Sequence, residues 1–225
     1  MPLDKAYLGA QLVGTYDERH FGGPGGQFVL HKDLRIMARL IGVPRGMILD
    51  IPCGTGIYSA ALRQQGYALV GADASGDMLH LAQNQAGGLD LLQADIHRLP
   101  FEPGSLAGVM IIRLFQHLTR SEFRAALDQV KLSICPDGWI LFDTLRWSPR
   151  RVASEDRRGM HVYSMPECRQ VIQEAGLTVH ASISAYMFSA IRYRRLPVGL
   201  LKLLERIEAC TPAPWRLRTF WLCGR

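Results

Sequence analysis

Apolar runs and amphipathic stretches alternate along most of this 225-residue chain. Short apolar runs predict buried strands, and apolar positions that recur every three or four residues predict helices packed on one face. Seven runs are predicted as strands: 47–51, 68–73, 89–95, 106–113, 139–144, 177–189 and 217–223. Six stretches are predicted as helices: 27–41, 57–65, 76–85, 119–134, 164–176 and 197–209. This order predicts an α/β fold, a doubly wound, mostly parallel seven-stranded sheet with helices on both faces.

Local signals sharpen some of these boundaries. Thr119 with Glu122, and Ser164 with Glu167, have the spacing of capping boxes, which predicts that a helix begins at each pair. Residues 136–138, Pro-Asp-Gly, predict a turn before the fifth strand. Residues 21–26, Phe-Gly-Gly-Pro-Gly-Gly, are too rich in glycine for a helix interior. They predict either the hinge of a lid or a flexible connector.

The composition is that of one globular domain, which we expect to span residues 1–225. No apolar run approaches the roughly 20 residues of a membrane helix, and the first residues lack the apolar core of a signal peptide. The five cysteines form no Cys-x-x-Cys pair and no zinc spacing, so we expect reduced thiols and no metal site. These features together predict a cytoplasmic protein.

The positive charge is concentrated in the last third of the chain. Residues 1–144 carry 12 basic and 14 acidic side chains, whereas residues 145–225 carry 14 basic and 6 acidic ones. Such a surplus suits an acidic small molecule, a nucleic acid or an anionic membrane surface. A solvated, arginine-rich surface is the alternative.

The most informative chemistry is a glycine loop between the first predicted strand and its helix. Gly54 and Gly56 let a ligand approach the backbone closely. Ser59 stands where a dinucleotide fold needs a third glycine, and the Gly-Lys-Ser/Thr of a phosphate loop is missing. Asp73 and Asp95 end the next two strands, at the sheet edge where ligands of such folds bind.

Four segments, in order and at the expected spacing, resemble the class I S-adenosylmethionine-dependent methyltransferases. They are ILDIPCGTG (48–56), VGADASGDML (70–79), LLQADIHRLPFEPGSLAGVMIIRLFQHL (91–118) and CPDGWILFDT (135–144). The chain is most similar in these segments to the small-molecule group that includes the ubiquinone and menaquinone methyltransferases. The resemblance implies a Rossmann-like methyltransferase fold and S-adenosyl-L-methionine as cofactor. We expect an N-terminal helical lid or substrate segment (1–45), a cofactor-binding core (46–144), and a C-terminal part of the sheet with substrate-side elements (145–225).

The resemblance implies a role for individual residues around the methionine part of the cofactor. Asp50, Gly54 and Gly56 would surround it, and Tyr16 would close over its carboxylate. Arg113 would face the sulfonium side, although an ordinary ion pair is the alternative for this residue.

It also implies the residues around the nucleoside part. Asp73 would hold the ribose hydroxyls, and Met78 would pack on the adenine unless it is a core residue. Asp95 would accept from the adenine amino group, with the Ile96 backbone beside it.

His117 is the best candidate for a general base, because it follows the fourth predicted strand closely and imidazole suits proton removal near neutral pH. A structural histidine is the alternative, since holding nucleophile and methyl group in line suffices in many transfers.

The leading hypothesis is methyl transfer to an oxygen, nitrogen or carbon nucleophile of a small molecule. Arginine and aromatic residues outside the core suit an acceptor that is anionic, phenolic or lipid-linked. The alternatives are an RNA methyltransferase, favoured by the basic last third, and a cofactor-binding subunit without activity. Arg113-Leu-Phe-Gln replaces the Asn/Asp-Pro-Pro-aromatic motif that follows the fourth strand in enzymes that methylate nucleobase exocyclic amines.

Overall fold

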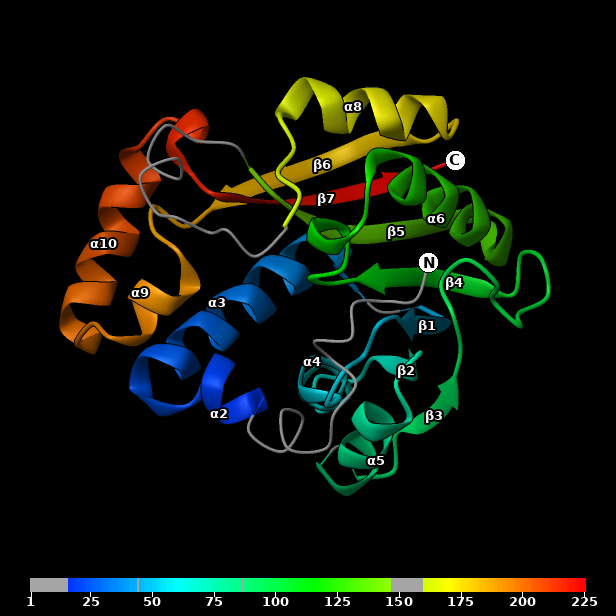
Figure 1. Ribbon diagram of the computed structural model, residues 1–225, viewed down its shortest axis with the longest axis horizontal. Helices are drawn as coiled ribbons and strands as arrows, with labels where there is room; N and C mark the ends of the chain where they lie inside the picture. Colours follow the sequence, from blue (N-terminus) through cyan, green and yellow to red (C-terminus); the bar gives the residue numbers. More distant parts are fainter. Residues whose placement is uncertain (1–15, 44, 86, 147–159) are drawn as a thin grey trace.

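A seven-stranded sheet forms the centre of the molecule (Figure 1). The computed structural model describes residues 16–43, 45–85, 87–146 and 160–225. The strands, in the order β3-β2-β1-β4-β5-β7-β6, are parallel except for β7, which is antiparallel to both of its neighbours. Their bounds are β1 Met47–Asp50, β2 Ala68–Asp73, β3 Asp90–Gln93, β4 Leu106–Ile111, β5 Ile134–Leu145, β6 Thr178–Ala185 and β7 Arg218–Gly224. The predicted fold class is therefore confirmed.

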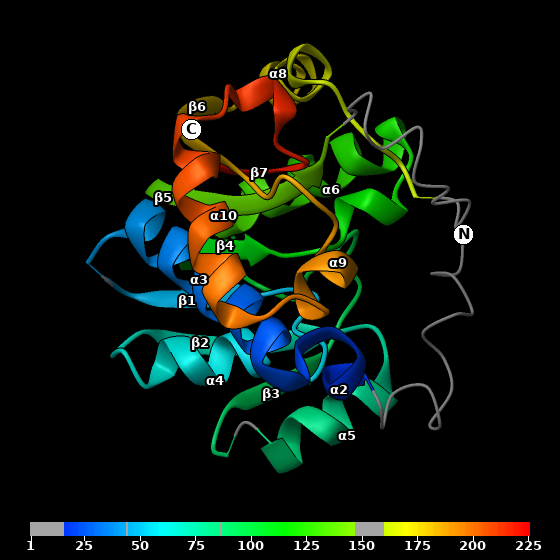
Figure 2. The ribbon, with the colours of Figure 1, turned by 90° about the vertical axis from the view of Figure 1, so that its left-hand side faces the viewer.

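Helices cover both faces of the sheet (Figures 1 and 2). On one face pack α6 (Arg120–Ser133) and α8 (Met165–Glu174), and on the other α3 (Gly23–Ile41), α4 (Ile57–Arg63), α9 (Ala190–Arg194) and α10 (Val198–Cys210). Two further helices are α2 (Tyr16–Phe21), before α3, and α5 (Gly76–Gln85), beside β2 and β3. Short 3-10 turns lie at Phe115–His117 and Ala213–Trp215. No helix among the described residues is long and apolar enough to cross a membrane.

The central strands are buried on both sides, which explains their continuous apolar sequence. In β4, Val109 and Ile111 face the α6 side, whereas Met110 faces the α3 side, and all three are fully buried. Strand order reverses between β1 and β4, because β2 and β3 extend from one side of β1 and β4 begins the other. A ligand site is expected beyond the carboxyl ends of these strands.

Both predicted capping boxes are confirmed. The Thr119 side chain accepts from the Glu122 backbone N–H while the Glu122 carboxylate accepts from the Thr119 N–H, and Ser164 and Glu167 form the same pair of bonds. Apart from the three segments described next, the predicted elements agree with the structure to within two residues at each end.

The prediction for residues 21–26 is wrong, because most of this glycine-rich segment is helical. Helix α2 ends at Phe21 and α3 begins at Gly23, so a single residue, Gly22, separates them. The glycines, which have no Cβ, allow neighbouring backbone to pack closely against this segment. A Cβ on Gly25 would lie 2.6 Å from the backbone oxygens of Tyr193 and Arg194.

Two strand predictions also need correction. Residues 136–138 do not form a turn before β5 but lie inside it, as a bulge. A step of five residues from Ile134 to Trp139 matches a step of two on β4. The sixth strand ends at Ala185 rather than at residue 189, because Tyr186 has φ 69° and redirects the chain toward α9.

The close contact at Gly25 predicts a loss of stability on substitution. Gly25→Ala should lower the free energy of unfolding by about 1–3 kcal/mol, because the added methyl group meets backbone atoms that cannot move aside locally. Denaturant unfolding measures this change. Gly199→Ala, which adds the same methyl group in α10 with no atom within 4 Å, is the control and should not destabilise. Equal effects of the two substitutions would contradict the packing role.

Candidate active site

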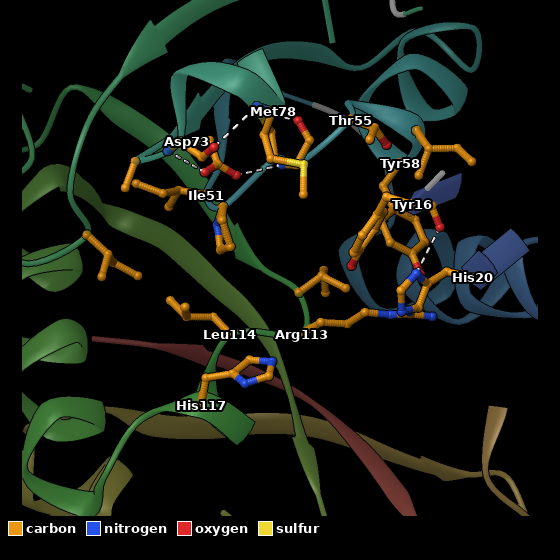
Figure 3. A pocket seen from close by; sticks show the side chains of 18 of the residues that line it. Tyr16, His20, Ile51, Thr55, Tyr58, Asp73, Met78, Arg113, Leu114 and His117 are labelled. Atoms are coloured by element: carbon orange, nitrogen blue, oxygen red, sulfur yellow. Dashed lines mark hydrogen bonds between the residues drawn. The ribbon is translucent and has the colours of Figure 1, made fainter. Parts of the chain in front are cut away.

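A cavity of about 190 Å³ opens at the carboxyl ends of β1, β2 and β4. Its wall comes from the loop after β1, the residues after β2 and β4, and helix α2. Figure 3 shows Asp73 and Met78 on one side of it, Tyr16 and His20 on another, and Arg113, Leu114 and His117 on a third. The pocket therefore lies where the strand order reverses, as expected for this sheet topology.

The glycine loop faces this pocket with bare backbone. Gly54 and Gly56 have φ values of 55° and 75°, in the left-handed region that glycine enters without strain. A Cβ built on Gly54 would meet no atom within 4 Å, so the space beside it belongs to the pocket. Gly56 precedes α4 and lies between the lining residues Thr55 and Ile57.

Asp73 brings a carboxylate to the same pocket from the end of β2. It is only 7% exposed, and its two oxygens accept from the backbone N–H groups of Gly54 and Ser75, each at 2.9 Å. Burial raises the pKa of Asp73, and these backbone hydrogen bonds partly oppose the shift. Each oxygen has a further lone pair with which to accept from a ligand.

Asp50 lies beneath the loop and is not among the lining residues. It is 1% exposed, and one oxygen accepts from the Ser59 hydroxyl at 2.5 Å. Burial raises the pKa of Asp50 to about 7; the Ser59 hydrogen bond opposes this shift, and the negative charge of Asp73 adds to it.

On the far side of Asp73, the pocket is apolar. Met78, Ala94 and Ile96 line it. Asp95 is exposed and does not line the cavity, and its Oδ1 accepts from the backbone N–H of His97. The predicted contact of Asp95 with a ligand stays a prediction.

Helix α2 closes the other end of the pocket. The ring of Tyr16 stacks on His20 with centroids 4.1 Å apart, and both residues line the cavity with Phe21 (Figure 3). Thr55 of the glycine loop donates a 2.7 Å hydrogen bond to Asp17, which ties α2 to the loop. Burial raises the pKa of Asp17, an effect that the Thr55 bond partly offsets.

Arg113 and His117 follow β4. Arg113 has φ 64°, which is unusual for a residue with a side chain, and its guanidinium lies 4.8 Å from the ring centre of Phe21. His117 lies half-buried in the 3-10 turn, with Nε2 3.0 Å from the side-chain nitrogen of Gln116. An amide nitrogen only donates, so in this arrangement Nε2 holds the lone pair.

Comparison with known proteins shows which family the segment that carries this pocket matches. A model of the methyltransferase domain matches residues 48–138, the segment that carries the glycine loop, Asp73 and Arg113. A solved S-adenosylmethionine-dependent methyltransferase of Thermotoga maritima, described as a possible histamine N-methyltransferase, superposes with a TM-score of 0.72 over 96% of each chain. At 13% identity, it shows the shared fold. Residues 48–138 therefore belong to the methyltransferase domain family, and the whole chain has the fold of the solved S-adenosylmethionine-dependent methyltransferases.

Curated relatives of this methyltransferase differ in what they are named for. The 18S rRNA (guanine-N(7))-methyltransferase bud23 of Schizosaccharomyces pombe is 38% identical over 88 residues, 38% of this chain and 33% of that protein. The demethylmenaquinone methyltransferase of Clavibacter sepedonicus is 29% identical over 144 residues, 63% of this chain and 55% of that protein. The chain thus spans between about a third and just over half the length of these relatives.

The structure brings most of the predicted residues of the methyltransferase together. The predicted residues in the lining are Tyr16, Gly54, Asp73, Met78, Ile96, Arg113 and His117. Gly56 adjoins it in the loop, Asp50 lies below it and Asp95 lies outside it. Of the described residues, no group of three or more His, Cys, Asp and Glu side chains could hold a metal ion.

A buried charge network behind the pocket was missed by the sequence analysis. Arg218, which begins β7, donates from Nε to Asp143 and from Nη1 to Asp33, both at 2.6 Å. Tyr58 and Tyr186 also donate to Asp33. Burial raises the pKa of Asp33, but Arg218 and Arg113 outweigh burial and the pKa is lowered. The one signal was an acid, Asp33, beside Leu30, Leu34 and Met37 on the predicted apolar face.

The raised pKa of Asp50 predicts a pH dependence of stability. The folded chain holds this proton up to about pH 7, whereas the unfolded carboxyl releases it near pH 3.8. The folded state therefore binds more protons between these values, and the Asp50 contribution to stability falls as the pH rises through that window. Asp50→Asn, which keeps an oxygen for Ser59, should flatten the fall in melting temperature between pH 4 and 7. An unchanged pH profile in the variant would contradict the assignment.

Proposed function

We propose that this methyltransferase transfers the methyl group of S-adenosylmethionine to a small-molecule acceptor. The single observation that carries the proposal is that Asp73 and the open backbone at Gly54 share one pocket, joined by a 2.9 Å hydrogen bond. This arrangement fits the cofactor, because the carboxylate can accept from two ribose hydroxyls while the bare backbone leaves room for the methionine part. When bound, the cofactor would supply a methyl group on a sulfonium, whose sulfur leaves as the neutral thioether S-adenosylhomocysteine when a nucleophile takes the methyl group.

The remaining lining residues suit the other parts of the cofactor. Met78 and Ile96 offer apolar surface to the adenine, and Tyr16 and the Gly54–Gly56 backbone flank the space for the methionine part. Asp50, below the loop, would support this space indirectly, through its hydrogen bond with Ser59 of α4, rather than by direct contact. Asp95, outside the lining, would reach the adenine amino group only after its side chain turns toward the pocket.

His117 is our candidate for the group that takes the proton of the acceptor. It lines the same pocket from the end of β4, with its Nε2 lone pair facing the Gln116 amide. Proton removal would exchange that amide hydrogen bond for one to the acceptor. His117→Gln should then slow turnover without changing cofactor affinity.

The small-molecule class is favoured over RNA by the way the structure uses its basic residues. Among the described residues of the last third of the chain, five arginines are bound within the fold. Four of them, Arg146, Arg194, Arg216 and Arg225, donate to backbone carbonyls, and Arg218 pairs with two buried carboxylates. The aromatic pocket wall formed by Tyr16, Phe21 and Tyr58 suits an anionic or phenolic acceptor, or the head group of a lipid-linked one.

The RNA alternative keeps one observation in its favour, the 38% identity to the rRNA methyltransferase bud23. Filter binding of total RNA at rising salt separates the two functions. An RNA methyltransferase should bind with a steep salt dependence, whereas no retention even at low salt would exclude it.

Calorimetric titration with S-adenosylmethionine and S-adenosylhomocysteine tests the proposal itself, and failure to bind either would overturn it. Turnover of radiolabelled cofactor in metabolite extracts, followed by mass identification of the methylated product, separates an enzyme from a cofactor-binding subunit without activity.

We further propose that residues 1–225 form a single methyltransferase domain and that the protein works in the cytoplasm. A single sheet unites the described strands, and all five cysteines are free, as suits a reducing compartment.

A further inference from the structure

Arg113 brings a positive charge into a pocket whose other lining residues are mostly apolar or hydroxylic. Among the described residues that line the cavity, no other lysine or arginine occurs. The side chain leaves the end of β4 and extends toward the α2 end of the pocket (Figure 3). There the guanidinium lies near the face of Phe21 and close enough to the phenols of Tyr16 and Tyr58 to interact with them electrostatically.

Within the described part of the chain, no side chain forms a hydrogen bond or a salt bridge with this guanidinium. The nearby carboxylate of Asp33 already pairs with Arg218 at 2.6 Å and accepts from two tyrosines. No nitrogen of the Arg113 side chain is among the buried atoms that lack a partner, so its donors face the open pocket and can bond to a ligand there.

The backbone of Arg113 is fixed in an unfavourable conformation. Its φ of 64° persists because the backbone N–H donates a 2.6 Å hydrogen bond to Asp143, which Arg218 holds in turn. Backbone strain of this kind survives only where the surroundings enforce it, and it is concentrated at functional sites. The network of Asp33, Arg218 and Asp143 therefore acts as the support that aims Arg113 into the pocket.

We propose that Arg113 binds a carboxylate in this pocket. The inference rests on the proposed function and names the chemistry of one end of the same site. The cofactor contains a sulfonium, an ammonium and one carboxylate, so its carboxylate is the group that a cation such as Arg113 would bind. Arginine and a carboxylate can meet through two parallel hydrogen bonds, which fixes orientation as well as affinity. Two sources supply this group: the methionine part of the cofactor and an aromatic carboxylate acceptor held between the rings.

Calorimetry with two cofactor analogues separates the first source. S-adenosylhomocysteine contains the carboxylate, whereas 5′-methylthioadenosine keeps the nucleoside and lacks the amino acid. If Arg113 binds the cofactor, Arg113→Gln should weaken binding of S-adenosylhomocysteine roughly ten- to a hundredfold. Binding of methylthioadenosine should not change.

The second source is tested on protein saturated with S-adenosylhomocysteine. Benzoate serves as the probe and benzamide as its uncharged analogue. If Arg113 binds the acceptor, benzoate should bind the wild-type protein and lose at least tenfold in affinity in Arg113→Gln. Benzamide should show no such difference.

Two further variants distinguish a loss of binding from a loss of folding. Arg113→Gly removes the side chain and tolerates φ 64° without strain, so it should reproduce the binding loss with an unchanged or higher melting temperature. Arg124→Gln, the same substitution at an exposed ion pair on α6, should change no affinity.

Unchanged binding of both S-adenosylhomocysteine and benzoate in both Arg113 variants would overturn the inference and leave the proposed function intact. Equal weakening of S-adenosylhomocysteine and methylthioadenosine would also overturn it, because it would show a general disturbance of the pocket. Wild-type protein that binds neither analogue would overturn the proposed function as well.

Discussion

Replacing Asp73 with alanine is expected to weaken binding of S-adenosylmethionine by several-fold to about a thousandfold. Charge-assisted hydrogen bonds are worth roughly 1.5–3 kcal/mol each, and this carboxylate can make two to a ribose. The substitution also removes the acceptor for the Gly54 N–H, which loosens the glycine loop. Calorimetric titration of the folded variant measures the effect.

Asp77→Ala is the matched control, because Asp77 is exposed four residues later and the substitution changes the net charge equally. Cofactor affinity in this variant should stay within a factor of about two. If Asp73→Ala retains wild-type affinity, another acid holds the ribose, and exposed Asp95 would be the first to test.

Replacing Gly54 with valine should abolish cofactor binding while the protein stays folded. A Cβ at this position meets no protein atom within 4 Å, so the branched side chain would occupy the space beside the loop rather than the core. The φ of 55° adds backbone strain of about 1–2 kcal/mol, which a domain of this size can survive. Circular dichroism and calorimetry on the same sample separate folding from binding.

Gly104→Val carries the same kind of strain without touching the pocket. Gly104 has φ 74° in the turn before β4, and its nearest neighbour is 4.0 Å from the Cβ position. It should destabilise the protein comparably and leave cofactor affinity intact. Retained binding in folded Gly54→Val would mean that the loop does not hold the cofactor.

The parts of this fold that the sequence predicts well are those set by local chemistry. The alternation of apolar runs, the capping boxes at Thr119 and Ser164, and the acid at the end of β2 all depend on residues close together along the chain. The prediction for the glycine-rich segment, residues 21–26, was wrong for a physical reason. Gly25 is needed for contact with α9, about 170 residues away, and no local pattern distinguishes such packing from a flexible hinge.

The same reason explains what was missed in the site. The hydrogen bond between Thr55 and Asp17, and the pairing of Arg218 with Asp33, join residues that are 38 and 185 positions apart. A single sequence contains no distances of this kind. The pocket edge was predictable because parallel strands bring their carboxyl ends together whatever lies behind them. The network of Asp33, Arg218 and Asp143 that orients Arg113 can be identified only in the folded structure.

The place of β7 inside the sheet also sets the order in which the molecule can be assembled. The chain leaves the ribosome from its N-terminus, so β5 and β6 emerge before the strand that pairs with both. Until Arg218–Gly224 appears, β6 lacks its partner in the sheet, and Asp33 and Asp143 lack the guanidinium that lies between them. Pairing of Arg218–Gly224 therefore joins β6 to the rest of the sheet and places a guanidinium between two buried acids, so the last strand of the chain completes both the sheet and the charge network.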